Sequence, residues 1–400
     1  MKKILTLFWI LLSVGTVYAQ QTVDYILKAR ALTEAGKPEQ AINMLSGAIT
    51  EKKESRLYIE RAEANILKGD YSGAISDFNE ANKISPFSGE YGLSRIYALK
   101  SDAATALYHL EINLNSPFKK SEKEIMLDPA FGVIENRQEW RQFWKKEWYS
   151  ITEKSVSEIE YYVSAGKIDE SKAVLSELKK SYQSNDDILY AEALINLASG
   201  NYSEVIKTIS GLTAINPGNE KYLRILAKAQ TGASNPVGAS ATYSQLLSSG
   251  VADAELLILR AECYRKTGET DKAMTDIDKY LEIYPENKAG LSLAGKVEAI
   301  SGDNLKAIEY FSKNLKLHPN DPECYVDRAN SYFVSKSWDL AINDYSMSLD
   351  LRPENSDIWL NKGIALLNSG KVEDACHDFR RSFSLGNKHV TDYISRNCIK

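Results

Sequence analysis

The chain has 400 residues, of which 26% are charged, and its formal net charge is −5. This length exceeds the usual size of a single hydrophobic core, so we expect either several domains or a stacked repeat. The mild acidity is spread along the chain, which excludes a basic surface for nucleic acid as the main mode of binding.

The first twenty residues have the pattern of a secretory signal. Two lysines precede an apolar run over residues 4–12, and the small residues Val17 and Ala19 define a cleavage site. The run is too short to favour the alternative, a membrane anchor, and no later segment approaches membrane-spanning length. We predict that residues 1–19 are a signal peptide and that the chain has no stable membrane insertion after cleavage. The mature protein is expected in the periplasm or elsewhere in the cell envelope, or secreted.

Helix-turn-helix units follow the signal. Gly36 and Gly69 each precede a small and then a bulky side chain, at the same offsets in both cases. A third unit, roughly residues 87–117, keeps Ala106 and Leu110 but has Asp102 where the glycine is expected. We predict an N-terminal array of about three units over residues 20–118.

This rhythm breaks over residues 119–151, where three of the six tryptophans lie. After a turn at residues 128–129 we predict a helix that carries an aromatic stripe on one face. One interpretation is that the stripe is buried and covers the ends of the two arrays. The other is an exposed partner site, because Trp is enriched at interface hot spots. The side chains concerned are Trp140, Phe143, Trp144 and Trp148.

Seven positions that recur at one constant interval, a 34-residue period, organise the rest of the chain. Five residues after each comes a small or short side chain, and four residues further on a bulky one. The seven positions are Gly166, Gly200, Ser234, Gly268, Gly302, Lys336 and Gly370. The short side chains are Ser171, Val205, Ala239, Ala273, Ala307, Ala341 and Ala375, and the bulky ones are Leu175, Ile209, Tyr243, Ile277, Phe311, Tyr345 and Phe379.

This spacing predicts pairs of packed helices. The glycine ends the first helix in a left-handed conformation, and the small residue lets the second helix approach closely. Pro217, Pro285, Pro319 and Pro353 then stop four of the second helices at the same phase. We predict an all-α solenoid, with seven units over residues 152–387 and a capping helix over residues 388–400.

The units resemble tetratricopeptide repeats. In the last unit Trp359, Gly363, Leu366, Gly370, Ala375 and Phe379 occupy positions 4, 8, 11, 15, 20 and 24 of the family pattern. The resemblance implies that the first helices line a concave groove used for extended peptides or partner helices. The carboxylate clamp of chaperone-binding members is not implied, because Val326 stands in place of one of its lysines and its other cations are also missing.

The groove positions of the last four units give a candidate partner-binding surface. These residues are Ile258, Glu262, Arg265, Lys296, Val326, Asn330, Phe333, Leu360, Ile364 and Leu367. The last two units place mostly apolar residues there. That strip is either an exposed interaction site or a surface that the C-terminal residues cover.

Two cysteines near the C-terminus are predicted to lie at the same level of antiparallel helices. Cys376 and Cys398 could therefore pair in an oxidising compartment, the alternative being two buried thiols. Cys263 and Cys324 lie on first helices two units apart, too far for a bond.

No motif for catalysis, a cofactor or a metal is found in the sequence, and the four histidines are scattered. The leading hypothesis is an exported scaffold without catalytic activity that holds a protein or peptide partner during envelope assembly, secretion or adhesion. The alternative is a binding protein for a small molecule or glycan in the concave groove.

Overall fold

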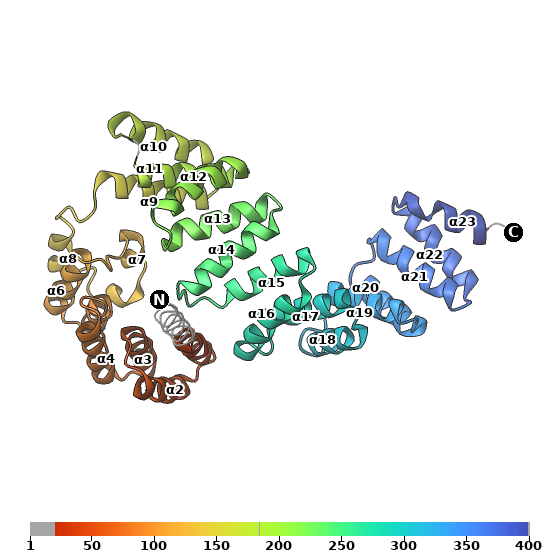
Figure 1. The fold of residues 1–400 in the computed structure, drawn as a ribbon, viewed down its shortest axis with the longest axis horizontal. Helices are drawn as coiled ribbons and strands as arrows, with labels where there is room; N and C mark the ends of the chain where they lie inside the picture. The colour runs from red at the N-terminus through yellow and green to blue at the C-terminus, as the bar shows by residue number, and fades with distance from the viewer. Residues whose placement is uncertain (1–20, 184, 399–400) are drawn as a thin grey trace, which may run out of the picture. The chain divides into compact units, whose positions relative to one another are not determined.

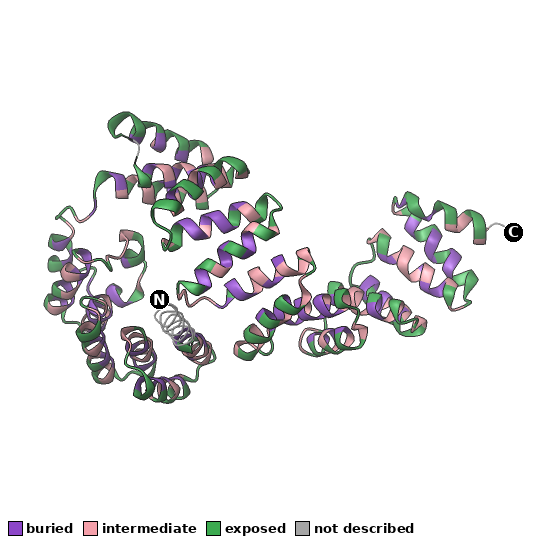
Figure 2. Ribbon diagram, in the orientation of Figure 1, coloured by how far each residue is buried: buried purple, intermediate pink, exposed green. Residues whose placement is uncertain are grey.

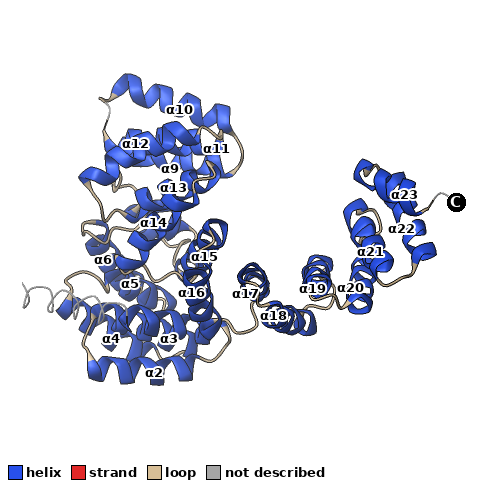
Figure 3. Cartoon of the chain, turned by 45° about the vertical axis from the view of Figure 1, so that its right-hand side comes forward, coloured by secondary structure: helices blue, strands red, loops and turns tan. Residues whose placement is uncertain are grey.

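The computed structural model describes residues 21–183 and 185–398. Every regular element in these ranges is a helix, as Figure 3 shows. The predicted signal peptide lies outside the described residues. None of the helices in the described part of the chain combines the length and the apolar character needed to cross a membrane.

The chain divides into two compact units, the first ending at Ala254 and the second beginning at Glu255 (Figure 1). This boundary lies inside the segment that the sequence predicts as one seven-unit array. The first unit contains a helix over residues 21–34, then α2 (Pro38–Glu51), α3 (Ser55–Lys68), α4 (Tyr71–Ile84), α5 (Glu90–Leu99), α6 (Ala103–Leu114), α7 (Glu122–Met126), η1 (Pro129–Val133), α8 (Gln138–Phe143), α9 (Ile151–Ser164), α10 (Ile168–Ser181), α11 (Asp186–Ala198), α12 (Tyr202–Ile215), α13 (Glu220–Gly232) and α14 (Pro236–Ser248). The second contains α15 (Glu255–Thr267), α16 (Thr270–Ile283), α17 (Lys288–Ser301), α18 (Asn304–Leu317), α19 (Pro322–Val334), α20 (Trp338–Leu351), α21 (Ser356–Asn368), α22 (Val372–Ser384), η2 (Lys388–Val390) and α23 (Thr391–Asn397).

The first helix of each pair ends at the position that recurs with the predicted 34-residue period. All seven positions have a positive φ, from +55° at Ser234 to +94° at Gly302, including the two that are not glycine. In the third unit the left-handed residue is Ser101, with φ +62°, and Asp102 instead caps α6 by accepting a hydrogen bond from the Thr105 amide. The glycine-equivalent position in that unit is therefore Ser101 and not Asp102.

The small and bulky positions form the core between paired helices. All seven predicted small residues of the period have no exposed surface, and every predicted bulky one is buried. Figure 2 shows the buried stretches of the helices in purple. The fit is tight at Gly363, where an added Cβ would lie 2.6 Å from the Phe379 ring. Packing of this kind confirms the predicted helix pairs.

A buried ion pair recurs between first and second helices. In three units an arginine and an aspartate 16 residues apart make two hydrogen bonds of 2.6–3.0 Å, and in the last unit Lys362 lies 3.2 Å from Asp378. The three pairs are Arg61–Asp77, Arg260–Asp276 and Arg328–Asp344.

Two of these arginines also tie neighbouring units together. Arg61 Nη1 donates to Ser46 Oγ at 2.9 Å, and Arg328 Nη1 donates to Ser312 Oγ at 3.0 Å. Each serine lies on the second helix of the preceding unit. The guanidinium therefore satisfies polar groups on both sides of a unit boundary.

The aromatic helix is shorter than predicted. α8 ends at Phe143 and Trp144 is its C-cap residue, so the prediction of a helix running through Trp148 is wrong. The Trp148 indole N–H donates to the Phe143 carbonyl at 3.0 Å, and the two rings stack with centroids 4.6 Å apart. These contacts turn the chain back over the end of α8.

The C-terminal cap also differs from the single helix predicted over residues 388–400. It begins with the 3₁₀ turn η2, and α23 then extends only to Asn397. Asn387 accepts a hydrogen bond from the His389 amide at 3.0 Å and thereby starts the turn. Val390 is fully buried and packs with Leu366, Ala375 and Phe379.

Candidate functional site

Two adjoining cavities lie on the first-helix side of the first compact unit. One, of about 580 Å³, is lined by side chains between residues 119 and 127, by Tyr149 and by residues of α9, α11 and α13. The other, of about 620 Å³, is lined by residues of α9, α11 and α13. Val156, Asp187 and Lys221 line both, so the cavities form one continuous surface, which we call the α9–α13 groove.

The groove follows the repeat. Val156, Tyr190 and Arg224 are each one period apart, and one further period leads to Ile258 of the predicted surface. Glu153, Asp187 and Lys221 form a second row at the same spacing. The positions used to choose groove residues in the last four units would therefore have found the first row from the period alone. The second row lies three residues earlier in the repeat, at a position that the prediction did not use.

Lysine–glutamate pairs border the first cavity. Lys119 Nζ lies 2.7 Å from Glu153 Oε1, and Lys120 Nζ lies 3.0 Å from Glu124 Oε1. Both glutamates also close capping boxes, Glu124 at the start of α7 and Glu153 at the start of α9. Burial acts to raise the pKa of each carboxyl, but hydrogen bonds from the paired lysine and the capping serine outweigh it and lower the pKa. This edge of the groove thus keeps its carboxylates ionised.

Three buried tyrosines supply aromatic surface and hydroxyl groups. Tyr149 donates to the Lys120 carbonyl at 2.7 Å, with Lys119 Nζ 4.5 Å from its ring centroid. The Tyr190 and Tyr222 rings lie 5.9 Å apart, and Tyr190 donates to Glu160 at 3.4 Å. Burial, reinforced by nearby carboxylates, raises the pKa of all three phenols, so they remain neutral donors.

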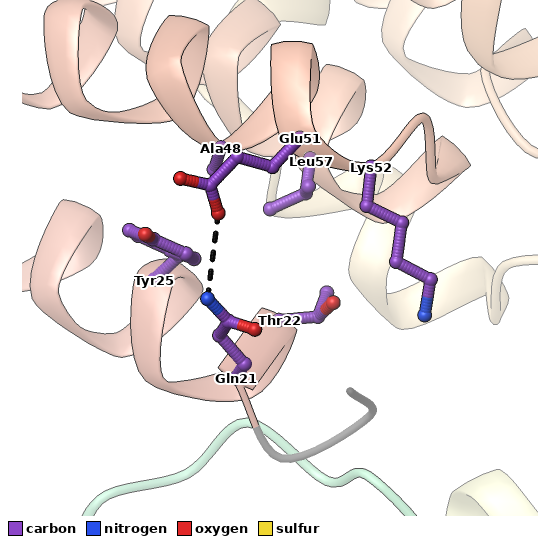
Figure 4. Close-up of a pocket in the computed structure, with 7 residues that line it drawn as sticks. All are labelled: Gln21, Thr22, Tyr25, Ala48, Glu51, Lys52 and Leu57. Carbon is purple, nitrogen blue, oxygen red and sulfur yellow. Dashed lines mark hydrogen bonds between the residues drawn. The ribbon is translucent and has the colours of Figure 1, made fainter. Parts of the chain in front are cut away.

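A smaller cavity of about 290 Å³ lies between the helix over residues 21–34, α2 and the start of α3 (Figure 4). Tyr25, Ala48 and Leu57 give it an apolar wall. Gln21 Nε2 donates to Glu51 Oε2 at 3.4 Å across its opening, as the dashed line in Figure 4 marks. Its size suits a small group rather than an extended chain.

The predicted surface of the second unit is largely engaged by the chain itself. Arg265 makes two 2.7 Å hydrogen bonds to Glu262, and Asn330 Oδ1 accepts one from Tyr345 at 2.6 Å. Lys296 lies 3.3 Å from Asp327, and although burial raises the pKa of that carboxyl, the lysine acts in the opposite direction.

The apolar members of that surface are partly buried. Ile258 packs against one core cluster, and Val326 and Phe333 against another. Leu360, Ile364 and Leu367 pack on the cluster that also holds Tyr393 and Ile394 of the cap. The structure therefore divides the predicted residues among three clusters, the last of them shared with the C-terminal residues.

The aromatic segment packs as core. Trp140 and Phe143 are each 7% exposed, and the half-buried Trp144 and Trp148 pack on the same cluster with Leu107 and Leu110 of α6. The stripe therefore packs on α6 of the N-terminal array, which is one half of the interpretation that it covers the ends of both arrays.

The cysteines pair as the sequence suggested. Cys376 and Cys398 form a disulfide with Cα atoms 5.5 Å apart, whereas Cys263 and Cys324 are free and buried. No cluster of His, Cys, Asp or Glu within residues 21–183 and 185–398 is arranged to hold a metal ion.

Helix pairs at a constant period, closed by a left-handed residue and stacked side by side, define an α-solenoid of the helix-turn-helix class. Models of the tetratricopeptide repeat match residues 26–89, 254–287 and 326–382. The chain is a tetratricopeptide repeat protein. Proteins of this class serve as scaffolds for protein–protein interaction.

Its relatives are partial matches. The chain is 26% identical over 153 residues to a DnaJ homolog subfamily C member 7 homolog of Schizosaccharomyces pombe, covering 34% of this chain and 32% of that protein. It is 30% identical over 81 residues to the Hsp70-Hsp90 organizing protein of Triticum aestivum, covering 20% of this chain and 14% of that one. The chain thus spans a third or less of either relative.

Among solved structures, a tetratricopeptide repeat protein from Parabacteroides merdae has 19% sequence identity and a TM-score of 0.48. The match covers 61% of this chain and 96% of that one.

Proposed function

We propose that the chain is an exported scaffold that binds an extended segment of a protein partner in the α9–α13 groove. The observation that supports this proposal most directly is the groove itself. It is a continuous surface across the three first helices α9, α11 and α13, and its lining includes charged side chains, tyrosines and Val156. Asp187 and Lys221, which are exposed and of opposite charge, could meet polar groups of an extended peptide there. Similarity to an Hsp70-Hsp90 organizing protein supports a protein as the partner.

The cell envelope is the proposed place of action. The support is the signal pattern of residues 1–19 and the Cys376–Cys398 disulfide, since disulfides persist in oxidising compartments. Cell fractionation, with mass spectrometry of the purified chain, tests the proposal. We expect a mature chain that begins at Gln20 in the envelope or medium, and a full-length chain in the cytosol would refute export.

Photo-crosslinking in intact cells tests the groove. A photoreactive residue at Lys221, which is exposed and lines both cavities, should join the chain to a specific partner. Lys207 on α12 is the matched control, because it is also an exposed lysine of the first compact unit but lies on a second helix, outside the groove. Equal products from both positions, or none from Lys221, would argue against a partner in the groove.

A small molecule or glycan in the same groove is the second candidate. The volumes of about 580 and 620 Å³ are typical of ligand pockets, and aromatic rings such as Tyr190 suit sugar faces. A ligand of this kind would raise the melting temperature by an amount that grows with the logarithm of its concentration above Kd. Thermal-shift screening of glycans separates the two candidates, since a melting temperature that no glycan changes leaves the protein partner.

A further inference from the structure

Residues 250–253, which follow α14, contact the opposite end of the first compact unit. Arg30 Nη1 donates to the Ala252 carbonyl at 2.7 Å, which links residues 222 positions apart. The same guanidinium holds Glu60 of α3 through Nε, at 3.0 Å, and through Nη2. Because the Glu60 side chain is only 13% exposed, this pair fixes the guanidinium in the direction of the Ala252 carbonyl.

Packing accompanies the hydrogen bond. Ala252 lies against the core cluster of the first repeat, which includes Ile26 and Leu57. The chain also passes close to α3 at Gly250, where an added Cβ would lie 3.2 Å from Arg56 Nη1. Two helices at one end of the unit therefore meet a loop from its other end.

The helix over residues 21–34 is buried on two faces. Ile26 and Ala29 face the first repeat, while Val23 and Leu27, spaced with Arg30 along another face, are 1% and 4% exposed. The face that carries Arg30 is therefore covered, as is the face that packs on the first repeat.

The neighbouring residue connects the loop to the groove. Asp253 Oδ2 lies 2.9 Å from Arg224 Nη1, and Arg224 Nε donates to Glu220 at 2.8 Å. Burial acts to lower the pKa of Arg224, and the hydrogen bonds to Glu220 and Asp253 reverse this and raise it. Arg224 is also a lining residue of the groove.

We infer that residues 250–253 are a clasp that closes the first compact unit, held by Arg30 at one side and by Arg224 at the other. The evidence for the clasp is the set of contacts within the first compact unit. Only its release by a bound partner rests on the proposed function. A partner carboxylate that reaches Arg224 from the groove competes with Asp253 for the guanidinium. Occupation of the groove by an acidic segment is then coupled to release of the clasp.

Paired spin labels on the mature chain test the closed state. The labels replace Glu34, at the end of the first helix, and Ser248, at the end of α14, both exposed, with the two free cysteines changed to alanine. We expect a single narrow distance distribution. Ala252→Glu should broaden it toward longer distances, since a carboxylate cannot enter the apolar cluster. The control Ala233→Glu, in an exposed loop of the same unit, should leave it unchanged.

Hydrogen exchange gives a second measurement that does not depend on a bulky substitution. Arg30→Met keeps the length of the side chain but removes its donors to both Ala252 and Glu60, so exchange in residues 21–34 should rise about tenfold. Glu60→Gln, which leaves the donor to Ala252 in place, should give a smaller rise. Asp253→Asn should give a smaller rise in the same helix.

The clasp is overturned by a broad distance distribution in the parent. It is also overturned if Ala252→Glu leaves the distribution unaltered and Arg30→Met leaves exchange in residues 21–34 unaltered. That result leaves the proposed function standing, because crosslinking from Lys221 needs no closed unit. A narrow distance distribution without any crosslink from Lys221 would support the clasp and refute the proposed partner in the groove.

Discussion

Ser234 and Lys336 hold a left-handed backbone that glycines hold at the other positions of the period. Their φ values are +55° and +58°, close to the +71° and +76° of Gly166 and Gly200. A residue with a Cβ is disfavoured there by about 1–2 kcal/mol. The repeat therefore tolerates a local cost at two of its turns because packing on both sides fixes the turn.

Replacing Lys336 with glycine should stabilise the second compact unit, which begins at Glu255. Relief of the left-handed strain exceeds the entropy that glycine adds to the unfolded chain, giving a net gain of about 0.5–1 kcal/mol. Thermal unfolding followed by circular dichroism measures it. Lys336→Ala keeps the Cβ and should give no gain, so equal stabilisation by both variants would contradict the backbone explanation.

Replacing a buried aspartate should destabilise the protein, in contrast to replacing Lys336. Removing the carboxylate in Asp344→Ala leaves the Arg328 guanidinium, 19% exposed, without its bidentate partner. We expect a loss of about 3–5 kcal/mol, measured by denaturant unfolding. Asp339→Ala is the control, because the Asp339 side chain is 79% exposed beside Lys371 and should change stability by less than about 1 kcal/mol. Similar losses for both would contradict a special role for the buried pair.

At the scale of elements, the short cap α23 depends on a covalent bond. It has seven residues, none of them buried, and the cluster below it contains Val390 from the preceding turn. A helix of this length has little stability of its own in water. The Cys376–Cys398 bond closes a loop with a sequence separation of 22 and keeps α23 on the cluster.

Loss of that bond should loosen the cap. Cys398→Ser is expected to cost about 3 kcal/mol by the loop-entropy relation and to expose Leu366 and Phe379 to solvent. Differential scanning calorimetry with and without reductant measures the effect. The free and buried Cys324 supplies a control, since Cys324→Ala should leave the sensitivity to reductant intact. A melting temperature that reductant does not alter would contradict the prediction.

Elements that obey the period could be predicted from the sequence, and those outside it could not. The left-handed turns and buried alanines follow from one residue type at a fixed spacing, as at Gly302 and Ala307. The aromatic segment has the spacing of a helix through Trp148, but the helix ends at Phe143, and the Trp148 indole donates to the carbonyl of that residue. Helical periodicity does not show that a side chain five residues further on will bond to a carbonyl at the end of the helix.

At the scale of the whole molecule, the period also carries the candidate site, since rows such as Val156, Tyr190 and Arg224 come from successive units. The site could therefore be found in outline from the sequence. The sequence could not show whether a given row of side chains is accessible or already paired within the chain, because ion pairs such as Glu262–Arg265 depend on rotamers and neighbours. For the same reason it could not show that apolar residues of the predicted surface in the second compact unit pack on its core clusters.

Charge reversal in the groove should weaken partner binding without changing stability. Lys221→Glu replaces a cation with an acid on a surface that already carries Glu160 and Asp187, and we expect affinity for the crosslinked partner to fall about tenfold. Titration calorimetry or biolayer interferometry measures it. Lys207→Glu makes the same change outside the groove and should bind normally. Binding that both variants weaken equally would indicate net charge as the cause.

The serine contacts of Arg61 and Arg328 give the units a fixed order of neighbours. Each arginine needs a hydroxyl on the unit before it, so removing the unit that carries Ser312 would leave Arg328 Nη1 facing a different side chain. Units that look interchangeable by their small and bulky residues are therefore not free to be shuffled, duplicated or deleted. An engineer who rearranges this chain would have to move each arginine together with the serine that precedes it.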